Sequence, residues 1–233
     1  MTPMVRCILW ANVLMFALQV MFTPEVNEWF SLSYIGADGF STHQLVTYSF
    51  LHAGLFHLFF NMLIIVLFGL ILEHVLGAKR FLIFYITSVV VAAMAQMGVN
   101  MYEMYQLTGT AFPVIDEQNW VFGFPGISQG FSGEALGLYF SKTMGASGAA
   151  FGLLVAFAYL FPNEKLYFLL VPIPIKAKWL VLAYVGLEVY LTFNGGPADN
   201  VAHVAHLGGG LVGLTLIWYW LRTNVIRRLI PRR

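Results

Sequence analysis

The stretch LHAGLFHLFFNMLIIVLFGLILEHVL, residues 51–76, is an apolar run long enough to cross a bilayer as a helix, which takes about 20 residues. Further apolar runs lie at residues 4–22, 81–99, 147–161, 179–193 and 201–221. The runs at 147–161 and 179–193 are short for a span, but a helix surrounded by protein need not match the full lipid thickness. The pattern predicts an all-α polytopic membrane protein with a bundle of six transmembrane helices.

The composition supports a chain that lives in lipid. Of the 233 residues, 59% are hydrophobic and only 10% are charged, whereas soluble domains are about half apolar and about a quarter charged. A water-facing surface needs more charge than this, so the lipid bilayer is the expected surrounding. The net charge of +1 gives no sign of a nucleic-acid partner. The single cysteine, Cys7, excludes an intrachain disulfide framework and a multi-cysteine metal site.

The charged residues orient the spans. If the N-terminus is cytoplasmic, the basic residues that fall inside are Arg6, Lys79, Arg80, Lys165, Lys176, Lys178, Arg222, Arg227, Arg228, Arg232 and Arg233. Only Lys142 of the twelve Lys and Arg falls outside. The acidic residues that fall outside are Glu25, Glu28, Asp38, Glu103, Asp116, Glu117, Glu134 and Asp199. Because Lys and Arg concentrate in cytoplasmic loops, this asymmetry predicts that both termini are cytoplasmic.

Two external loops, residues 23–50 and 100–144, complete a single predicted domain over residues 1–233. The first is rich in aromatic residues, and it is expected to lie in the membrane interface, where aromatic rings prefer to sit. The second is long and acidic, and a loop of that length is usually functional or contains short helices. The run at 4–22 could also be a cleaved signal peptide. Its length and the lack of a small-x-small cleavage site favour a span.

The motif Gly145-Ala-Ser147-Gly148 opens the fourth run. Flanking glycines let the backbone turn tightly and leave the serine hydroxyl uncrowded. The serine is expected at a helix N-terminus, where free N–H groups and the helix dipole favour negative charge on a reacting oxygen. Taken alone, the motif is more typical of close helix packing.

The segment Val201-Ala-His203-Val-Ala-His206-Leu-Gly-Gly209-Gly-Leu-Val-Gly213 opens the sixth run. Gly209 and Gly213 form a small-xxx-small face, which lets another helix approach closely. The fourth run has a matching face with Gly148 and Gly152. If the two faces meet, His206 lies near Ser147, as a base within reach of a nucleophile.

A third cluster, His57-Leu-Phe-Phe-Asn61, lies on the second run, where the four-residue spacing puts both polar side chains on one helix face. His52 lies nearer the outer surface. Polar groups without partners are costly in hydrocarbon, so a shared water-filled cavity facing Ser147 is the simplest explanation. In that cavity His57 and Asn61 would donate hydrogen bonds to an oxyanion.

A metal site is an alternative role for four of the histidines, His52, His57, His203 and His206. No H-E-x-x-H motif is present. Glu73 falls near the inner end of its span, where a cap or anchor role is favoured. Glu188 lies mid-span and could face either the cavity or a packing partner. We therefore expect no metal and no cofactor.

Together these motifs resemble the rhomboid family. The family pattern is G-x-S-G at the head of the fourth helix, A-H-x-x-G-x-x-x-G on the sixth and H-x-x-x-N on the second. Here they read Gly145-Ala-Ser147-Gly148, Ala205-His206-Leu-Gly-Gly209-Gly-Leu-Val-Gly213 and His57-Leu-Phe-Phe-Asn61. Residues 44–52 and Glu73 also resemble the family. One departure is His43-Gln44, where many relatives carry Trp-Arg, which leaves anchoring of that loop in lipid open.

The resemblance implies an intramembrane serine endopeptidase that cuts single-span membrane proteins near the outer face. It implies a Ser147–His206 dyad with no acidic third member, and no carboxylate is expected at the depth of His206. It also implies that His57, Asn61 and the Ser147 N–H bind the oxyanion, and that Phe151 orients His206. A bacterial inner membrane is the expected location. The alternatives are an inactive rhomboid-like protein that binds membrane clients, and a small channel or transporter.

Overall fold

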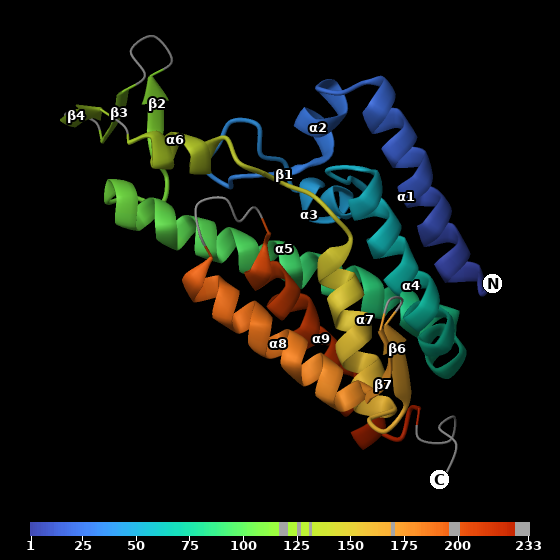
Figure 1. Ribbon diagram of the computed structural model, residues 1–233. Coiled ribbons are helices and arrows are strands. Elements are labelled where there is room, and N and C mark those ends of the chain that lie inside the picture. The colour runs from blue at the N-terminus through green and yellow to red at the C-terminus, as the bar shows by residue number, and fades with distance from the viewer. Residues whose placement is uncertain (117–120, 125–126, 131, 169–170, 196–200, 227–233) are drawn as a thin grey trace.

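The computed structural model describes residues 1–116, 121–124, 127–130, 132–168, 171–195 and 201–226. The long helices of the described residues form one bundle (Figure 1): α1 Pro3–Met21, α4 Leu55–Leu76, α5 Ala78–Thr108, α7 Ser147–Leu160, α8 Ala177–Asn194 and α9 His203–Arg222. Each overlaps one predicted run. In the described part of the chain, α1, α4, α5 and α9 are long and apolar enough to cross a membrane, and α7 is a shorter apolar helix.

Several short elements connect the bundle helices. The first loop that the sequence predicts to be external contains α2 Glu25–Phe30, β1 Leu32–Ser33, α3 Gln44–Thr47 and the 3-10 helix η1 Tyr48–Phe50. The second contains β2 Val114–Asp116, β3 Val121–Phe124, β4 Ile127–Gly130, α6 Gly133–Tyr139 and β5 Lys142–Thr143. An antiparallel hairpin of β6 Lys165–Phe168 and β7 Val171–Lys176 joins α7 to α8. The long second loop thus contains its own secondary structure.

Two predicted helix boundaries were wrong. The run at 81–99 underestimates α5, which has 31 residues and ends only at Gly109, a glycine with φ +76°. Apolarity stops near Val99, but a helix can continue as polar turns until a residue in the left-handed conformation ends it. The run at 51–76 begins too early, because α4 starts at Leu55 after Gly54.

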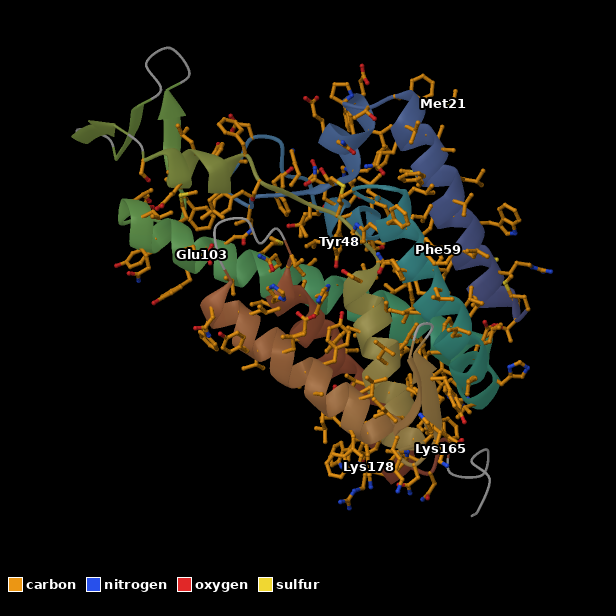
Figure 2. The ribbon with its side chains drawn as sticks, in the orientation of Figure 1. Met21, Tyr48, Phe59, Glu103, Lys165 and Lys178 are labelled. Atoms are coloured by element: carbon orange, nitrogen blue, oxygen red, sulfur yellow. The ribbon has the colours of Figure 1, made fainter. Side chains whose placement is uncertain are left out.

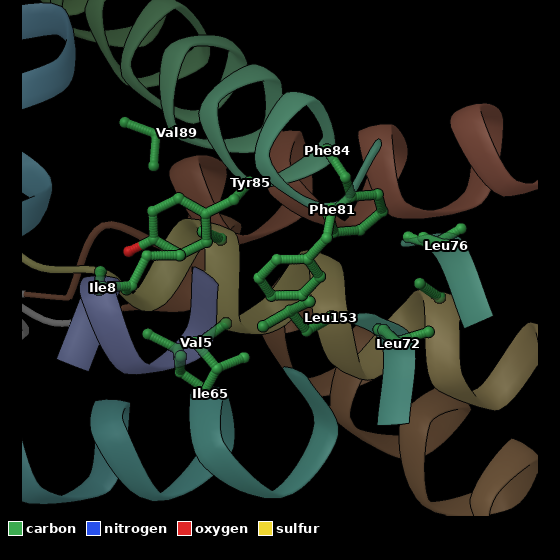
Figure 3. Close-up of a cluster of buried hydrophobic side chains, with 14 of the residues drawn as sticks. Val5, Ile8, Ile65, Leu72, Leu76, Phe81, Phe84, Tyr85, Val89 and Leu153 are labelled. Carbon is green, nitrogen blue, oxygen red and sulfur yellow. The ribbon is translucent and has the colours of Figure 1, made fainter. Parts of the chain in front are cut away.

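The main core lies where α1, α4, α5 and α7 meet (Figure 3). Its buried side chains include Val5, Ile65, Phe81, Phe84 and Leu153, each fully enclosed. Apolar side chains gain little by leaving lipid for protein, because lipid tails are equally apolar, so close van der Waals packing stabilises this core. The core holds the helices that carry the candidate site in fixed relative positions.

The first loop, residues 23–50, is anchored to the rest of the protein by Gln44, which is buried. The Oε1 atom of Gln44 accepts from the Ser33 N–H at 3.1 Å, and its Nε2 donates to the Gly39 carbonyl at 2.8 Å. In addition, β1 pairs antiparallel with β5, with Leu32 opposite Thr143. The loop is therefore tied to the segment that leads into α7.

Glu73 caps α1 from the end of α4. Its two carboxylate oxygens accept the backbone N–H groups of Met4 and Val5, each at 2.9 Å, and the side chain is 3% exposed. The first N–H groups of a helix have no intrahelical acceptor, and negative charge there is favourable. The predicted cap role of Glu73 is confirmed.

We expect Glu73→Gln to lower the free energy of unfolding by about 1–3 kcal/mol, because an amide leaves one buried N–H without an acceptor. Thermal unfolding in detergent micelles measures this loss. Glu25→Gln, at an exposed acidic residue of α2, is the matched control and should stay within about 0.5 kcal/mol of wild type. Equal stability of the two variants contradicts the cap.

Candidate active site

A strained glycine positions the serine. Gly145 has φ +133°, a region that side chains rarely adopt, and its N–H donates to the Tyr48 carbonyl at 3.0 Å. A methyl group on Gly145 would lie 2.9 Å from Nε2 of His57 and 3.6 Å from Oγ of Ser147. Only glycine allows this turn and this close approach. Ser147 follows as the first residue of α7.

Gly145 differs from its predicted role in helix packing. It lies before α7 and contacts the ring of His57 on α4, not a glycine face of another helix. Tyr48 supports the same turn from η1, because its hydroxyl donates to the Val89 carbonyl of α5 at 2.9 Å. Tyr48 lies near the start of α7 (Figure 2). The serine turn is therefore held by α4, η1 and α5.

The Nε2 atom of His57 lies beside the serine turn. Its Nδ1 atom accepts the backbone N–H of Ala53 at 3.3 Å. A neutral imidazole whose Nδ1 is an acceptor carries its proton on Nε2. That Nε2 atom is the one that faces Gly145. The local backbone thus sets the tautomer that a hydrogen-bond donor to an oxyanion requires.

Asn61 lies one turn further along α4 and is buried. One hydrogen of its amide Nδ2 is used within the helix, since Nδ2 donates to the His57 carbonyl at 3.0 Å. An amide nitrogen carries two hydrogens, so a second hydrogen can be donated to a ligand. His57 and Asn61 both line the cavity that contains Ser147.

The two predicted glycine faces do meet. A methyl group on Gly152 would lie 2.8 Å from the Gly209 carbonyl oxygen, and one on Gly148 would lie 3.3 Å from the carbonyl oxygen of Ala205. Methyl groups on Gly209 and Gly213 would collide with the carbonyl groups of Gly148 and Gly152. α7 and α9 therefore pack backbone against backbone, and the residues next to Ser147 and His206 are in contact.

Phe151 stacks on the imidazole of His206. The rings of Phe151 and His206 have centroids 5.9 Å apart and planes 17° apart. Tyr184 of α8 meets Phe151 edge-on, with centroids 5.1 Å apart. The structure thus places Phe151 against His206, as the resemblance implies, and adds Tyr184 behind it.

The expectation that no carboxylate lies at the depth of His206 was wrong. Glu188 of α8 is 3% exposed, and its Oε1 atom lies 3.0 Å from Nδ1 of His206. Its Oε2 atom lies 2.6 Å from Nδ1 of His203. The sequence left open whether Glu188 faces the cavity or a packing partner. The H-x-x-H spacing, which puts both histidines on one face of α9, was the signal that could have suggested a shared partner.

Glu188, His203 and His206 are also the residues that could hold a metal, because one ligand atom from each lies within 4.8 Å of the others. This trio differs from the predicted alternative of four histidines. His52 lies instead with His57, with ring centroids 5.1 Å apart. The four histidines thus form two ring pairs, His52 with His57 and His203 with His206.

A cavity of about 1040 Å³ joins these groups. Its lining includes Ser147, His206, His57, Asn61 and Phe151. Polar side chains also line the cavity, and they include Gln96, Asn100, Glu103, Ser141 and Lys142. Polar side chains of this kind can hold water, and the volume lies at the upper end of the range of ligand pockets, about 300–1,000 Å³.

Lys142, the basic residue predicted outside, is tied to the first loop. Its Nζ donates to Oγ of Ser33 at 2.7 Å. Partial burial lowers the pKa of the Lys142 ammonium, and the nearby carboxylate of Glu28 opposes that change. The lysine thus helps to hold the strand that precedes the serine turn.

The sequence model of the rhomboid domain family matches residues 40–223, which include every candidate active-site residue named above. The chain belongs to the rhomboid family. It is thus an integral membrane protein with an all-α polytopic rhomboid fold, in a family of intramembrane proteases. It is similar to Rhomboid protein 1, mitochondrial, of Saccharomyces cerevisiae, with 27% identity over 177 residues. That region covers 76% of this chain but 41% of the yeast protein, so the chain spans less than half the length of this curated relative.

Proposed function

We propose that this rhomboid is an active serine endopeptidase that cleaves single-span membrane proteins near the outer membrane face. One observation carries the proposal. Ser147, His206 and the Nε2–H of His57 come from three different helices and border one cavity. An inactive relative has no need for a nucleophile, a base and an oxyanion donor in one place.

The reaction divides into acylation and deacylation. The Oγ of Ser147 attacks the carbonyl carbon of the scissile peptide while Nε2 of His206 takes the hydroxyl proton. The tetrahedral oxyanion accepts hydrogen bonds from His57, Asn61 and the backbone N–H of Ser147. The C–N bond then breaks, and His206 gives its proton to the leaving amine. Water repeats the sequence on the acyl-enzyme and releases the new carboxyl group.

The start of α7 favours this chemistry. The first N–H groups of a helix have no intrahelical acceptor, and the helix dipole makes this end partly positive. Ser147 occupies the first helical position, so negative charge that develops on the substrate oxygen is stabilised there. No cofactor is needed for this reaction.

We further propose six spans in one domain, with both termini in the cytoplasm of a bacterial cell. Lys165 and Lys178 lie together at the end of the bundle away from Met21 (Figure 2), which supports a cytoplasmic location for that end. α7 begins at Ser147 and ends beside this lysine-bearing hairpin, so the serine faces the opposite, outer side. A substrate helix must unwind to enter the cavity, and helix-weakening residues are expected near its cleavage site.

Purified protein in proteoliposomes with a single-span reporter tests the proposal. We expect one internal cut, mapped by mass spectrometry to the outer end of the reporter span. A fluorophosphonate probe should label the peptide that contains Ser147. If the reporter stays intact and Ser147 stays unlabelled, the chain is an inactive rhomboid. Passage of a solute across the liposome membrane without cleavage of the reporter would instead favour a channel or transporter.

His57→Ala should lower kcat by about 10²- to 10³-fold with little change in KM, because an oxyanion donor acts mainly in the transition state. Steady-state cleavage of the reporter measures both constants. His74→Ala is the matched control, since His74 is exposed at the other end of α4. A large rise in KM at constant kcat would assign His57 to substrate binding instead.

A further inference from the structure

Glu188 connects the candidate base to a second histidine. It lies on α8 with both oxygens directed at α9: Oε1 is 3.0 Å from Nδ1 of His206, and Oε2 is 2.6 Å from Nδ1 of His203. All three side chains are buried. Each oxygen therefore serves a different imidazole, and the carboxylate bridges two successive turns of one face of α9.

The distances favour hydrogen bonds over a bound metal ion. In a tetrahedral zinc site with bonds of about 2.0–2.1 Å, neighbouring ligand atoms lie roughly 3.3 Å apart. The 2.6 Å separation of His203 Nδ1 and Glu188 Oε2 is shorter and matches a charge-assisted hydrogen bond. A buried carboxylate needs such partners, since an unpaired charge is costly in a low-dielectric interior.

Glu188 is the nearby acceptor for Nδ1 of His206. Among the described residues, that nitrogen has no aligned hydrogen-bond partner. The 3.0 Å approach of Glu188 brings an acceptor within reach, although the N–H does not yet point along it. Hydrogen bonds of catalytic groups are often poorly aligned before substrate binds.

We propose that Glu188 is a positioning residue that holds His206 with its proton on Nδ1, while His203 holds the other carboxylate oxygen. This inference rests on the proposed protease function. With Nδ1 protonated, the lone pair of Nε2 is free to accept the Ser147 proton. The imidazolium that forms then lies beside a negative charge. The catalytic unit becomes a Ser147–His206–Glu188 triad in place of the dyad that the family resemblance implies.

This arrangement gives one side of α8 a role in positioning His206. Tyr184 and Glu188 are four residues apart, so they lie on one side of α8. Tyr184 packs on Phe151, which stacks on His206, while Glu188 approaches the edge of the same imidazole. The imidazole is therefore covered on one face by a ring and approached at Nδ1 by a carboxylate.

Glu188→Gln is the first test, because it keeps the volume and removes the charge. We expect kcat to fall about 10²- to 10⁴-fold, as when an orienting acid is lost from a serine-protease triad, with KM unchanged. The rate of Ser147 phosphonylation by the fluorophosphonate probe should fall in parallel, since it requires no peptide binding. Tyr190→Phe, an exposed residue of α8, is the matched control and should leave both rates unchanged.

Glu188→Asp separates positioning from packing. Aspartate keeps the charge but loses volume, so positioning predicts that Asp retains more activity than Gln, and packing predicts the reverse order. The activities of the two variants are compared at a temperature where thermal unfolding shows both to be folded, so that poor folding of one variant does not decide the result. Activity of Gln equal to wild type, or Gln above Asp, overturns the role of Glu188. The role is also overturned if a chelator abolishes the wild-type activity and zinc restores it.

The wild-type reaction distinguishes this failure from failure of the protease proposal. If wild type cleaves the reporter and Ser147→Ala does not, the protease function stands whatever Glu188→Gln does. If wild type itself neither cleaves nor reacts with the probe, the protease function is wrong and the triad falls with it. His203→Gln should show a smaller loss of kcat than Glu188→Gln, because it acts on His206 only through the carboxylate.

Discussion

Ser147→Ala is expected to reduce reporter cleavage below detection, a fall in kcat on the order of 10⁴- to 10⁶-fold. Without Oγ no acyl-enzyme can form, and His206 has no hydroxyl nucleophile to activate. The turn should be unchanged, because the strained residue is Gly145 and its N–H donates to the Tyr48 carbonyl. Thermal stability in detergent should match wild type.

The double variant with His206→Ala makes this prediction sharper. A nucleophile and its base act as one unit, so the two losses should not add. We expect Ser147→Ala, His206→Ala and the double variant to share the same residual rate. Ser41→Ala, at an exposed serine of the first loop, is the control for serine replacement and should retain full activity. Residual cleavage in Ser147→Ala that His206→Ala then removes would assign the nucleophile to another residue.

The helix bundle could be predicted from the sequence because apolar length and glycine spacing are local properties. The start of α7 at Ser147 and its contact with α9 both follow from such patterns. The end of α5 does not, since its last turns are polar and only Gly109 stops them. The apolar run indicates the part of a helix that lies in lipid. The end of that run and the end of the helix differ wherever the helix continues beyond the membrane.

The carboxylate beside His206 could not be predicted for a related reason. α8 carries no glycine face that fixes its rotation against α9, so the sequence alone does not say where Glu188 points. Its direction depends on how two helices pack, which is a tertiary property. The tautomer of His57 is similar, because it depends on the Ala53 N–H of the turn before α4. Residue types predict the proposed reaction, whereas helix packing decides which groups lie beside each imidazole.

Gly209→Ala should cause the largest loss of stability among helix substitutions. Its methyl group would run into the Gly148 carbonyl group, which is backbone and cannot move aside without separating α7 from α9. Overpacking of this kind costs about 1–3 kcal/mol, and more where backbone must shift. The cleavage rate should also fall in protein that remains folded, because the displaced α9 carries His206 and the displaced α7 carries Ser147. A misplacement of about 1 Å can lower a rate about 10²-fold.

Gly98→Ala is the matched control for that substitution. Gly98 lies within α5, and a methyl group there meets nothing within 4 Å. Alanine also favours a helix over glycine by about 1 kcal/mol, so this variant should be at least as stable as wild type and fully active. Gly213→Ala, which meets the Gly152 carbonyl, should behave like Gly209→Ala. If Gly209→Ala instead matches Gly98→Ala in thermal unfolding and in cleavage, then α7 and α9 do not pack backbone against backbone, and contact between those helices cannot be what brings Ser147 to His206.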